Sequence, residues 1–384
     1  MCGDVYGNAA DLPARTPLLG LGGGSMAGAR VAILSSGIWR LRHLIQEMTG
    51  LKPEFLRARK RLQNDDIIGV AGWGHKPTAY LARDLARAAG KPYIAIEDGF
   101  LRSVRPGPRE MPLSLVFDTA GVHYDPNTES ELERLISAAA ARPRPAIEAR
   151  AGAGIARIRE LGISKYNGGP RLSAAQMGLG RAPRGGRVLV VDQTMGDGSV
   201  LCGPAGAHTF GEMLAAALRE HPDAQIIVKT HPEVVGGRKR GYLGRVQIQD
   251  DRVRLIDFDV NPWSLIDIVD HVYVVSSQLG FEALLGGCRV TCFGGPFYAG
   301  WGLTSDRATF SRRQARPTLE QLFAAVYLDY ARYIDPFRMR QTSFEGTLDE
   351  LAWRRDLALS GQAHRRAVVN GYRMATNMRA MLVA

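Results

Sequence analysis

One stretch of this chain constrains the fold more than any other, because it predicts a complete strand–helix–strand unit. The β-branched run Val272–Val275 predicts a buried strand, the apolar spacing of Leu279–Leu285 predicts a helix, and Arg289–Phe293 predicts a second strand. Short apolar strands alternate with helical segments along most of the remaining sequence. This alternation favours an α/β architecture with parallel sheets.

Ser276 and Ser277 stand between the first strand and the helix of this unit. In an open parallel sheet, ligands bind beyond the carboxyl ends of the strands, and the free N–H groups at a helix N-terminus favour a phosphate there. Glu282, one turn into the helix, is placed to accept hydrogen bonds from ribose hydroxyls. The stretch therefore predicts a nucleotide site. The same pattern also fits an ordinary N-cap serine and a first-turn acid, and the local sequence leaves both interpretations open.

Composition narrows the classes of partner. The formal net charge of +11 indicates an anionic partner, which is nucleic acid, phospholipid head groups or acidic sugars. Interleaved aromatic and basic readout motifs are missing, so we expect no nucleic acid. The four cysteines form no C-x-x-C pair, which argues against zinc and favours a reducing, cytoplasmic compartment.

The two ends of the chain have their own character. Residues 1–29 lack a signal-peptide pattern, so we expect a disordered leader, and Met26 is an alternative start. Residues 346–384 form a basic extension, in which residues 353–384 hold six arginines against one acid with apolar residues between them. That composition suits an amphipathic helix on an anionic membrane, or a solvated tail where a second module would begin. No apolar run reaches the ~18–20 residues of a membrane-spanning helix.

The chain between these ends divides at a Gly- and Arg-rich segment, residues 169–187, which we expect to be a linker. Residues 30–168 and 188–345 each repeat the order strand, polar loop, helix. We therefore predict two Rossmann-like domains facing a cleft, the GT-B-like α/β architecture known from glycosyltransferases, with the chemistry assembled from loops of both domains.

Polar residues follow several predicted strands at their carboxyl ends. Glu97 and Asp98 end the strand that begins at Tyr93, where they suit a general acid or base but also a simple Asp-Gly turn. Asp192 follows the strand Val188–Val191 in the same way, and its bland alternative is a turn or cap carboxylate. Another strand ends on Lys229 and continues into a His-Pro pair.

Eight segments, taken together and in order over roughly residues 30–355, resemble the KpsC family of capsular polysaccharide β-Kdo transferases of Gram-negative bacteria. Family members usually carry two such modules, and this chain resembles the N-terminal one, so it would complete only one of two alternating linkages. The segments are Gly37–Arg40, Trp73–His75, Glu97–Phe100, Ser164–Asn167, Val191–Thr194, Lys229–Pro232, Ser276–Leu284 and Phe297–Thr304.

The resemblance implies a reaction and its partners. Kdo, an acidic eight-carbon sugar, would pass from CMP-β-Kdo to a Kdo-primed lysophosphatidylglycerol-type lipid during capsule biosynthesis and export, with retention of anomeric configuration. The lipid acceptor implies a peripheral position at the cytoplasmic side of the inner membrane, and other capsule biosynthesis proteins as possible partners.

The resemblance also implies roles for single residues. In the second half, His231 and Pro232 would meet the CMP phosphate, and Asp192 would be the nucleophile that a retaining double displacement requires. Asp98, with Glu97 as the alternative, would be the base that deprotonates the acceptor hydroxyl. The remaining implied substrate contacts are Ser276, Ser277, Gln278 and Lys229 at the phosphate, Glu282 at the ribose, Gln193 at Asp192 or the sugar carboxylate, and His75 and Arg102 on the acceptor side.

We expect no metal and no other cofactor. Asp257 and Asp259 have the D-x-D spacing of a metal motif, yet the asparagine and proline that follow favour a strand end, and CMP-linked sugars carry a single phosphate. Two rival interpretations remain: a GT-B enzyme using another nucleotide sugar, and a catalytically silent scaffold partner of the capsule machinery. The joint presence of four residues argues against the silent partner: Asp98, Asp192, His231 and Glu282.

Overall fold

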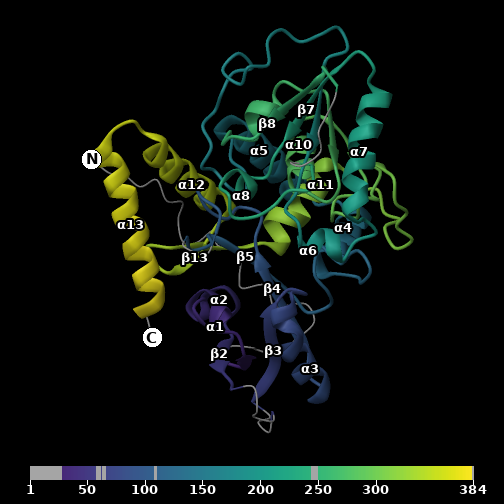
Figure 1. Cartoon of the computed structure of the whole chain (residues 1–384). Helices are drawn as coiled ribbons and strands as arrows, with labels where there is room; N and C mark the ends of the chain where they lie inside the picture. Colours follow the sequence, from purple (N-terminus) through teal and green to yellow (C-terminus); the bar gives the residue numbers. More distant parts are fainter. Residues whose placement is uncertain (1–27, 58–61, 63–65, 108–109, 244–249, 383–384) are drawn as a thin grey trace. The chain divides into compact units, whose positions relative to one another are not determined.

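The computed structural model describes residues 28–57, 62, 66–107, 110–243 and 250–382. The chain divides into two compact units (Figure 1). Unit 1 comprises Met1–Val122 and Val326–Ala384, and unit 2 comprises His123–Ala325. The expected leader, apart from its last two residues, and the alternative start at Met26 lie outside the described residues.

Unit 1 contains a seven-stranded mixed sheet in the order β13-β12-β5-β4-β3-β1-β2. The strands from β2 to β4 are parallel, whereas β5, β12 and β13 join antiparallel. The parallel half is the Rossmann-like part, and the chain enters the antiparallel half through a loop instead of a crossover helix. The strands are β1 (Arg30–Ile33), β2 (Lys52–Phe55), β3 (Ile67–Trp73), β4 (Tyr93–Asp98), β5 (Ser114–Asp118), β12 (Arg332–Asp335) and β13 (Arg340–Thr342).

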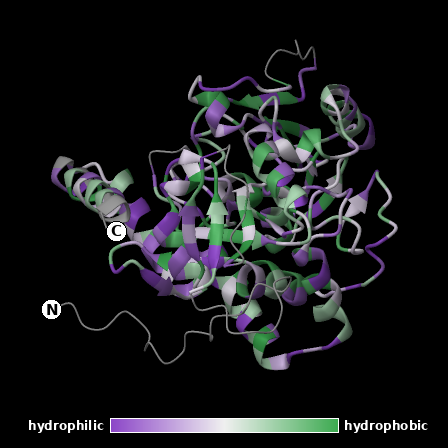
Figure 2. Cartoon of the chain, turned by 90° about the horizontal axis from the view of Figure 1, so that it is seen from below, coloured by the Kyte–Doolittle hydropathy of each residue, from purple (hydrophilic) through white to green (hydrophobic). Residues whose placement is uncertain are grey.

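The helices of unit 1 cover this sheet and build its core. Apolar side chains of α2, β1, β4 and β5 form one continuous buried cluster. Figure 2 shows several of the central strands coloured as hydrophobic. The last two helices pack against each other as a hairpin (Figure 1). The helices are α1 (Ser36–Trp39), α2 (Arg42–Thr49), the short 3-10 helix Pro77–Ala79, α3 (Tyr80–Ala88), α12 (Phe344–Leu359) and α13 (Ala363–Leu382), and the π-helix Ala324–Tyr330 precedes β12.

Unit 2 contains a six-stranded sheet that is parallel throughout. Its order is β11-β10-β9-β6-β7-β8, which is the 3-2-1-4-5-6 order of a Rossmann fold read from the other edge. The strands are β6 (Arg187–Val191), β7 (Gln225–Lys229), β8 (Val253–Ile256), β9 (His271–Val274), β10 (Arg289–Cys292) and β11 (Ser305–Asp306).

Local sequence explains where several helices of unit 2 begin and end. Ser130 caps α4 by accepting from the Glu133 N–H, and Thr318 with Gln321 forms a capping box on α11. Gly162 ends α5 in a left-handed conformation. The helices are α4 (Glu131–Ala141), α5 (Pro145–Leu161), α6 (Gly198–Leu201), α7 (Ala207–Glu220), α8 (Pro232–Val235), α9 (Trp263–Ile266), α10 (Leu279–Leu285) and α11 (Leu319–Phe323).

The α/β class with two Rossmann-like units is confirmed, but the division of the chain differs from the expected 30–168, 169–187 and 188–345. Residues 123–168 belong to unit 2 because α4 and α5 pack against α11. The expected linker is also part of unit 2: the Pro170 carbonyl accepts from Asn261 N–H at 2.9 Å, and Gly169 lies against the Val260 backbone. Residues 326–345 return to unit 1, where β12 pairs with β5.

Candidate active site

The topological switch point of unit 2 lies between β6 and β9, which are neighbours in the sheet although β7 and β8 separate them in sequence. In open parallel sheets, ligands bind beyond the carboxyl ends of the strands at this point. The segments that leave the carboxyl ends of β6, β7 and β9 carry the residues predicted for the donor: Asp192 and Gln193, then His231 and Pro232, then Ser276 and Ser277.

Gln193 and Ser276 join the two strands at the switch point. The Ser276 N–H donates to Gln193 Oε1 at 2.9 Å, and Gln193 Nε2 donates to Ser276 Oγ at 3.2 Å. Both side chains are buried. Gln193 is therefore occupied in fixing the turn after β9, and its predicted contact with the sugar carboxylate stays a prediction.

The hydroxyl of Ser276 lies within a small polar network. Ser199 Oγ donates to Asp197 Oδ1 at 2.8 Å and lies 2.8 Å from Ser276 Oγ. Ser276 Oγ can also donate to Gln193 Oε1 at 3.4 Å. These contacts shape the turn, and the predicted contact of Ser276 with phosphate stays a prediction.

Ser277 is held from two sides. Its Oγ accepts from the Leu279 N–H at 3.3 Å, and its carbonyl accepts from the buried hydroxyl of Tyr298. Gln278, the next residue, donates to Glu282 Oε1 at 3.3 Å. The turn predicted to bind phosphate is therefore a rigid element, and its contact with phosphate stays a prediction.

Asp192 is buried, with 1% of its surface exposed. Its Oδ1 accepts from the N–H groups of Gln193, Tyr242 and Leu243 at 2.9, 3.0 and 3.2 Å. Its Oδ2 has no hydrogen-bond partner within the described part of the chain and faces Gly241, where a Cβ would lie 2.1 Å from that oxygen. Burial raises the pKa of Asp192, and the three N–H donors oppose this shift. One oxygen is anchored and the other is uncommitted.

His231 precedes α8 and caps it: Nδ1 accepts from the Glu233 N–H at 3.1 Å. Burial lowers the pKa of His231 to about 4, so the ring is neutral at pH 7. With Nδ1 accepting, the proton of the neutral ring is on Nε2. His231 can therefore offer an Nε2–H donor to an anionic oxygen, and Pro232 occupies the first position of the helix, where a missing N–H costs nothing.

Lys229 is buried at the end of β7. Its ammonium group donates to the carbonyl oxygens of Thr230 and Phe258 at 2.7 and 3.2 Å. Burial lowers its pKa to about 8, while Asp259 and Asp257 oppose the shift. The D-x-D segment thus serves Lys229 electrostatically, and the predicted phosphate contact of Lys229 stays a prediction.

Glu282 is buried in α10 and bonds to the loop after α5. Ser164 Oγ lies 2.8 Å from each carboxylate oxygen, and the Lys165 N–H donates to Oε1 at 3.2 Å. Burial raises the pKa of Glu282 to about 7, against the opposing effect of the Ser164 hydrogen bond. These contacts give Glu282 a structural role that the local pattern did not reveal, and its predicted ribose contact stays a prediction.

The predicted acceptor-side residues lie in unit 1, at the carboxyl ends of β3 and β4. Asp98 Oδ2 accepts from Arg102 Nε at 2.7 Å, while its buried Oδ1 has no hydrogen-bond partner in the described ranges. Glu97 lies 3.9 Å from the Lys76 ammonium group. Arg102 therefore orients Asp98 and leaves one carboxylate oxygen for other chemistry.

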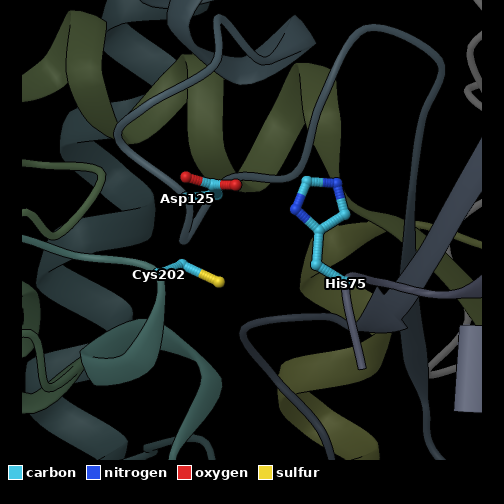
Figure 3. Close-up of side chains that lie close together, drawn as sticks. All are labelled: His75, Asp125 and Cys202. Carbon is cyan, nitrogen blue, oxygen red and sulfur yellow. The ribbon is translucent and has the colours of Figure 1, made fainter. Parts of the chain in front are cut away.

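His75 follows β3 in unit 1 and is drawn in Figure 3 with Asp125 and Cys202, two residues of unit 2. Asp125 precedes α4, and Cys202 ends α6. Asp125 and Cys202, the two residues of this group that belong to the same unit, would supply two metal ligands. A catalytic zinc site has three protein ligands. We assign no metal to this group, and the expectation of a metal-independent reaction stays a prediction.

Sequence reasoning missed the residues that hold the site together. Ser164 and Tyr298 stand in segments that carried the family resemblance, yet nothing local assigned them a partner. Asp197 and Ser199 follow Asp192 in the same loop, and their polar character was the available signal. Gly241 gave no signal, since its importance depends on the carboxylate it faces.

The fold and the site place this chain among α/β proteins with two Rossmann-like units, the architecture of GT-B glycosyltransferases. The chain belongs to the capsule polysaccharide biosynthesis protein family, whose model matches residues 69–168 and 170–333. It is 42% identical over 327 residues to the capsule polysaccharide modification protein LipA of Neisseria meningitidis serogroup B, covering 83% of this chain. It is 40% identical over 255 residues to the lipopolysaccharide-processing protein LpsZ of Rhizobium meliloti, covering 66% of this chain and 57% of that protein.

Two solved structures are similar along most of the chain. The β-Kdo 2,4 transferase of Thermosulfurimonas dismutans KpsC is 42% identical with a TM-score of 0.78, and the β-Kdo 2,7 transferase of the same KpsC is 28% identical with a TM-score of 0.62. Each comparison covers 84% of this chain and 98% of the other. The chain spans 45% of the length of the LipA relative.

Proposed function

We propose that this protein is a retaining β-Kdo transferase that moves Kdo from CMP-β-Kdo to a Kdo-primed lysophosphatidylglycerol-type lipid in capsule biosynthesis and export. The observation that carries the proposal is the similarity to the T. dismutans β-Kdo 2,4 transferase over 98% of that chain. The lower identity and TM-score to the 2,7 transferase favour the 2,4 linkage.

The proposed chemistry has two displacements. Asp192 Oδ2 attacks the anomeric carbon and the bond from that carbon to the phosphate oxygen breaks, with the His231 Nε2–H donating to the departing phosphate. The acceptor hydroxyl then displaces Asp192 and gives its proton to Asp98, with Glu97 as the alternative base. No step in this scheme requires a metal, so EDTA should leave activity unchanged.

We also propose that the protein works at the cytoplasmic face of the inner membrane, because the proposed acceptor is a lipid. The C-terminal hairpin offers a suitable surface: Val368, Met374 and Met378 are each more than half exposed, and the chain from 353 to 384 is strongly basic. Within the described residues, none of the helices is both long and apolar enough to cross a bilayer. Co-sedimentation with anionic but not neutral vesicles, lost on truncation at Glu350, tests this point. Other capsule proteins remain possible partners.

The decisive assay incubates purified protein with CMP-Kdo, generated in situ, and a synthetic acceptor ending in β-Kdo. Addition of one β-Kdo, with a 2,4 linkage by NMR, is the expected result. A 2,7 linkage would change only the proposed linkage and would leave the proposed β-Kdo transfer intact. If no Kdo were added although the protein still bound CMP, the silent scaffold would be favoured. If the protein transferred sugar from a UDP-sugar, the proposed donor would be wrong.

A further inference from the structure

A basic loop, residues 236–243, lies next to His231 and has no role in the scheme above. It leaves the end of α8 and exposes three consecutive cations, Arg238, Lys239 and Arg240. Glu233 connects the loop to the imidazole, since its N–H donates to His231 Nδ1 and its carbonyl accepts from the N–H groups of Arg238 and Lys239 at 2.9 and 3.1 Å. The loop therefore begins within one helical turn of His231, the residue proposed to donate a hydrogen bond to the phosphate.

The backbone of the loop is fixed along its whole length. The N–H groups of Gly236 and Gly237 donate back to α8, and the Arg240 carbonyl accepts from the Met195 N–H at 2.8 Å. Gly241 forms a bridge with Thr194 on the loop after β6. An exposed loop that only solvates its charges does not require such a complete set of backbone hydrogen bonds.

Asp192 fixes the far end of the loop. Its Oδ1 accepts from the N–H groups of Tyr242 and Leu243, and the Tyr242 ring stacks on Phe210 with ring centroids 4.1 Å apart. Leu243 is buried. The loop is thus attached both to the His231 side and to the Asp192 side of the switch point.

The three cations of the loop differ in their ion pairs. Lys239 pairs with Glu233 at 3.0 Å. Within the described ranges, Arg238 and Arg240 have no carboxylate within ion-pair distance. Guanidinium groups of this kind bind carboxylate and phosphate oxygens with two parallel hydrogen bonds.

We propose that Arg238 and Arg240 form an anion subsite for the donor, binding an oxygen of its phosphate or of its sugar carboxylate. This inference rests on the proposed function, because it takes the donor to be an acidic sugar on a nucleoside monophosphate. The loop then works as a preorganised arm that carries two cations, and Asp192 helps to position it. Preorganisation limits the ordering cost that flexible arginines would have to pay on binding.

The test compares the double variant R238Q/R240Q with the matched control R181Q/R184Q. Arg181 and Arg184 are also exposed, also belong to unit 2 and precede the amino end of β6, on the opposite edge of the sheet. Both variants remove two positive charges. The measurements are the Kd of CMP and of cytidine by calorimetry, the KM of the donor and of the acceptor, and the melting temperature.

An increase of at least tenfold in the Kd of CMP, with cytidine binding and the control unchanged, would identify the phosphate as the bound group. An increase of the same size in the donor KM alone would identify the sugar carboxylate. In both cases affinity for the bound group should fall with salt more steeply in the unmodified protein than in the variant.

Three results would overturn the inference. The donor KM and the CMP Kd could stay within twofold of the control, or only the acceptor KM could rise, or the control could lose as much affinity as the loop variant. An unmodified protein that binds neither CMP nor the donor would refute the proposed function itself, and the subsite with it.

Discussion

The two units differ in the sheet that carries their polar strand ends. Unit 2 is parallel throughout, so its polar strand ends gather along one side of the sheet, where Gln193 and Asp192 bond to segments far away in sequence. Unit 1 is parallel only from β2 to β4 and then turns antiparallel, so its polar residues gather at the ends of β3 and β4 alone. The polar cluster of unit 2 is accordingly more cross-linked than that of unit 1.

Because of this difference, polar residues at strand ends have different partners in the two units. In unit 2 most such residues bind each other or the backbone: Lys229 bonds to carbonyls, Gln193 to Ser276, and Asp192 to three N–H groups. In unit 1 Asp98 pairs with Arg102 through one carboxylate oxygen, and its other, buried oxygen has no hydrogen-bond partner in the described chain. Variants of the two units should therefore fail in different ways.

The largest effect is expected for Asp192→Asn. The amide oxygen can still accept from the three N–H groups, so the loop stays in place, but the amide cannot form the glycosyl-enzyme bond. We expect kcat to fall about 10⁴-fold or more, with CMP affinity and melting temperature unchanged. Intact-mass spectrometry of the unmodified protein with donor alone should show the covalent adduct, which the variant lacks.

Asp192→Ala is the comparison that separates the two tasks of this residue. It leaves three N–H donors without their acceptor, so we expect the free energy of unfolding to drop by about 2–3 kcal/mol in addition to the loss of turnover. If Asp192→Asn were as active as the unmodified protein, the carboxylate would be a positioning group only, and the nucleophile would have to be sought elsewhere.

Asp98→Asn in unit 1 is expected to lower turnover less than Asp192→Asn does, and to affect the second displacement. General-base catalysis contributes about 10²–10⁴-fold, so transfer to the acceptor should fall by that factor. The first displacement does not need this base, so release of one equivalent of CMP and formation of the adduct should persist in rapid-quench experiments. Glu97→Gln is the matched variant: a loss there with Asp98→Asn unaffected would move the base to Glu97.

The sequence was informative where structure depends on local pattern. The β-branched runs at β6 and β9 predict their strands correctly, and Asp192 and His231 follow the carboxyl ends of β6 and β7 as expected. The strands β12 and β13 carry mixed polar sequences and pair only because β5 offers an edge. Long-range partners such as Gln193 and Ser276, 83 residues apart, leave no local trace.

Domain boundaries were hard to predict for the same reason. The helices α4 and α5 follow unit 1 in sequence, yet they pack against α11, which comes much later, and Gln321 of α11 donates to Glu148 of α5 at 3.0 Å. A Gly- and Arg-rich composition at 169–187 was taken as a sign of a linker. Packing against residues 260–267 makes this segment part of unit 2 instead.

A third effect concerns stability, and it is specific to unit 2. Burial raises the folded-state pKa of Glu282 to about 7, above the unfolded value of 4.5, so stability is lost as pH rises from 4.5 through 7. Glu282→Gln removes this titration while keeping an acceptor for Ser164. Between pH 5 and pH 8, the free energy of unfolding of the variant should rise relative to that of the unmodified protein by up to about 3 kcal/mol, measured by urea unfolding. An equal pH dependence of both proteins would contradict the assignment.

An effect that is smaller for each single residue runs in the opposite direction and again separates the units. Burial lowers the pKa of His123 to about 3 and of His231 and His271 to about 4, all in unit 2. Because the unfolded value is 6.5, the unfolded chain binds protons first as pH falls, and each neutral buried histidine then costs stability. For His123 the loss reaches about 2 kcal/mol at pH 5.

Hydrogen exchange in the Glu282→Gln background isolates this histidine effect, since Glu282 no longer opposes it. Peptides from β6 and β9 should lose protection between pH 7 and pH 5, after correction for intrinsic rates, while peptides from β3 and β4 of unit 1 should change less. Unit 1 contributes His43, whose pKa is also lowered by burial, so its response is not zero. Equal losses in both units would show that acid acts on the whole chain through global charge, and not through the buried histidines of unit 2.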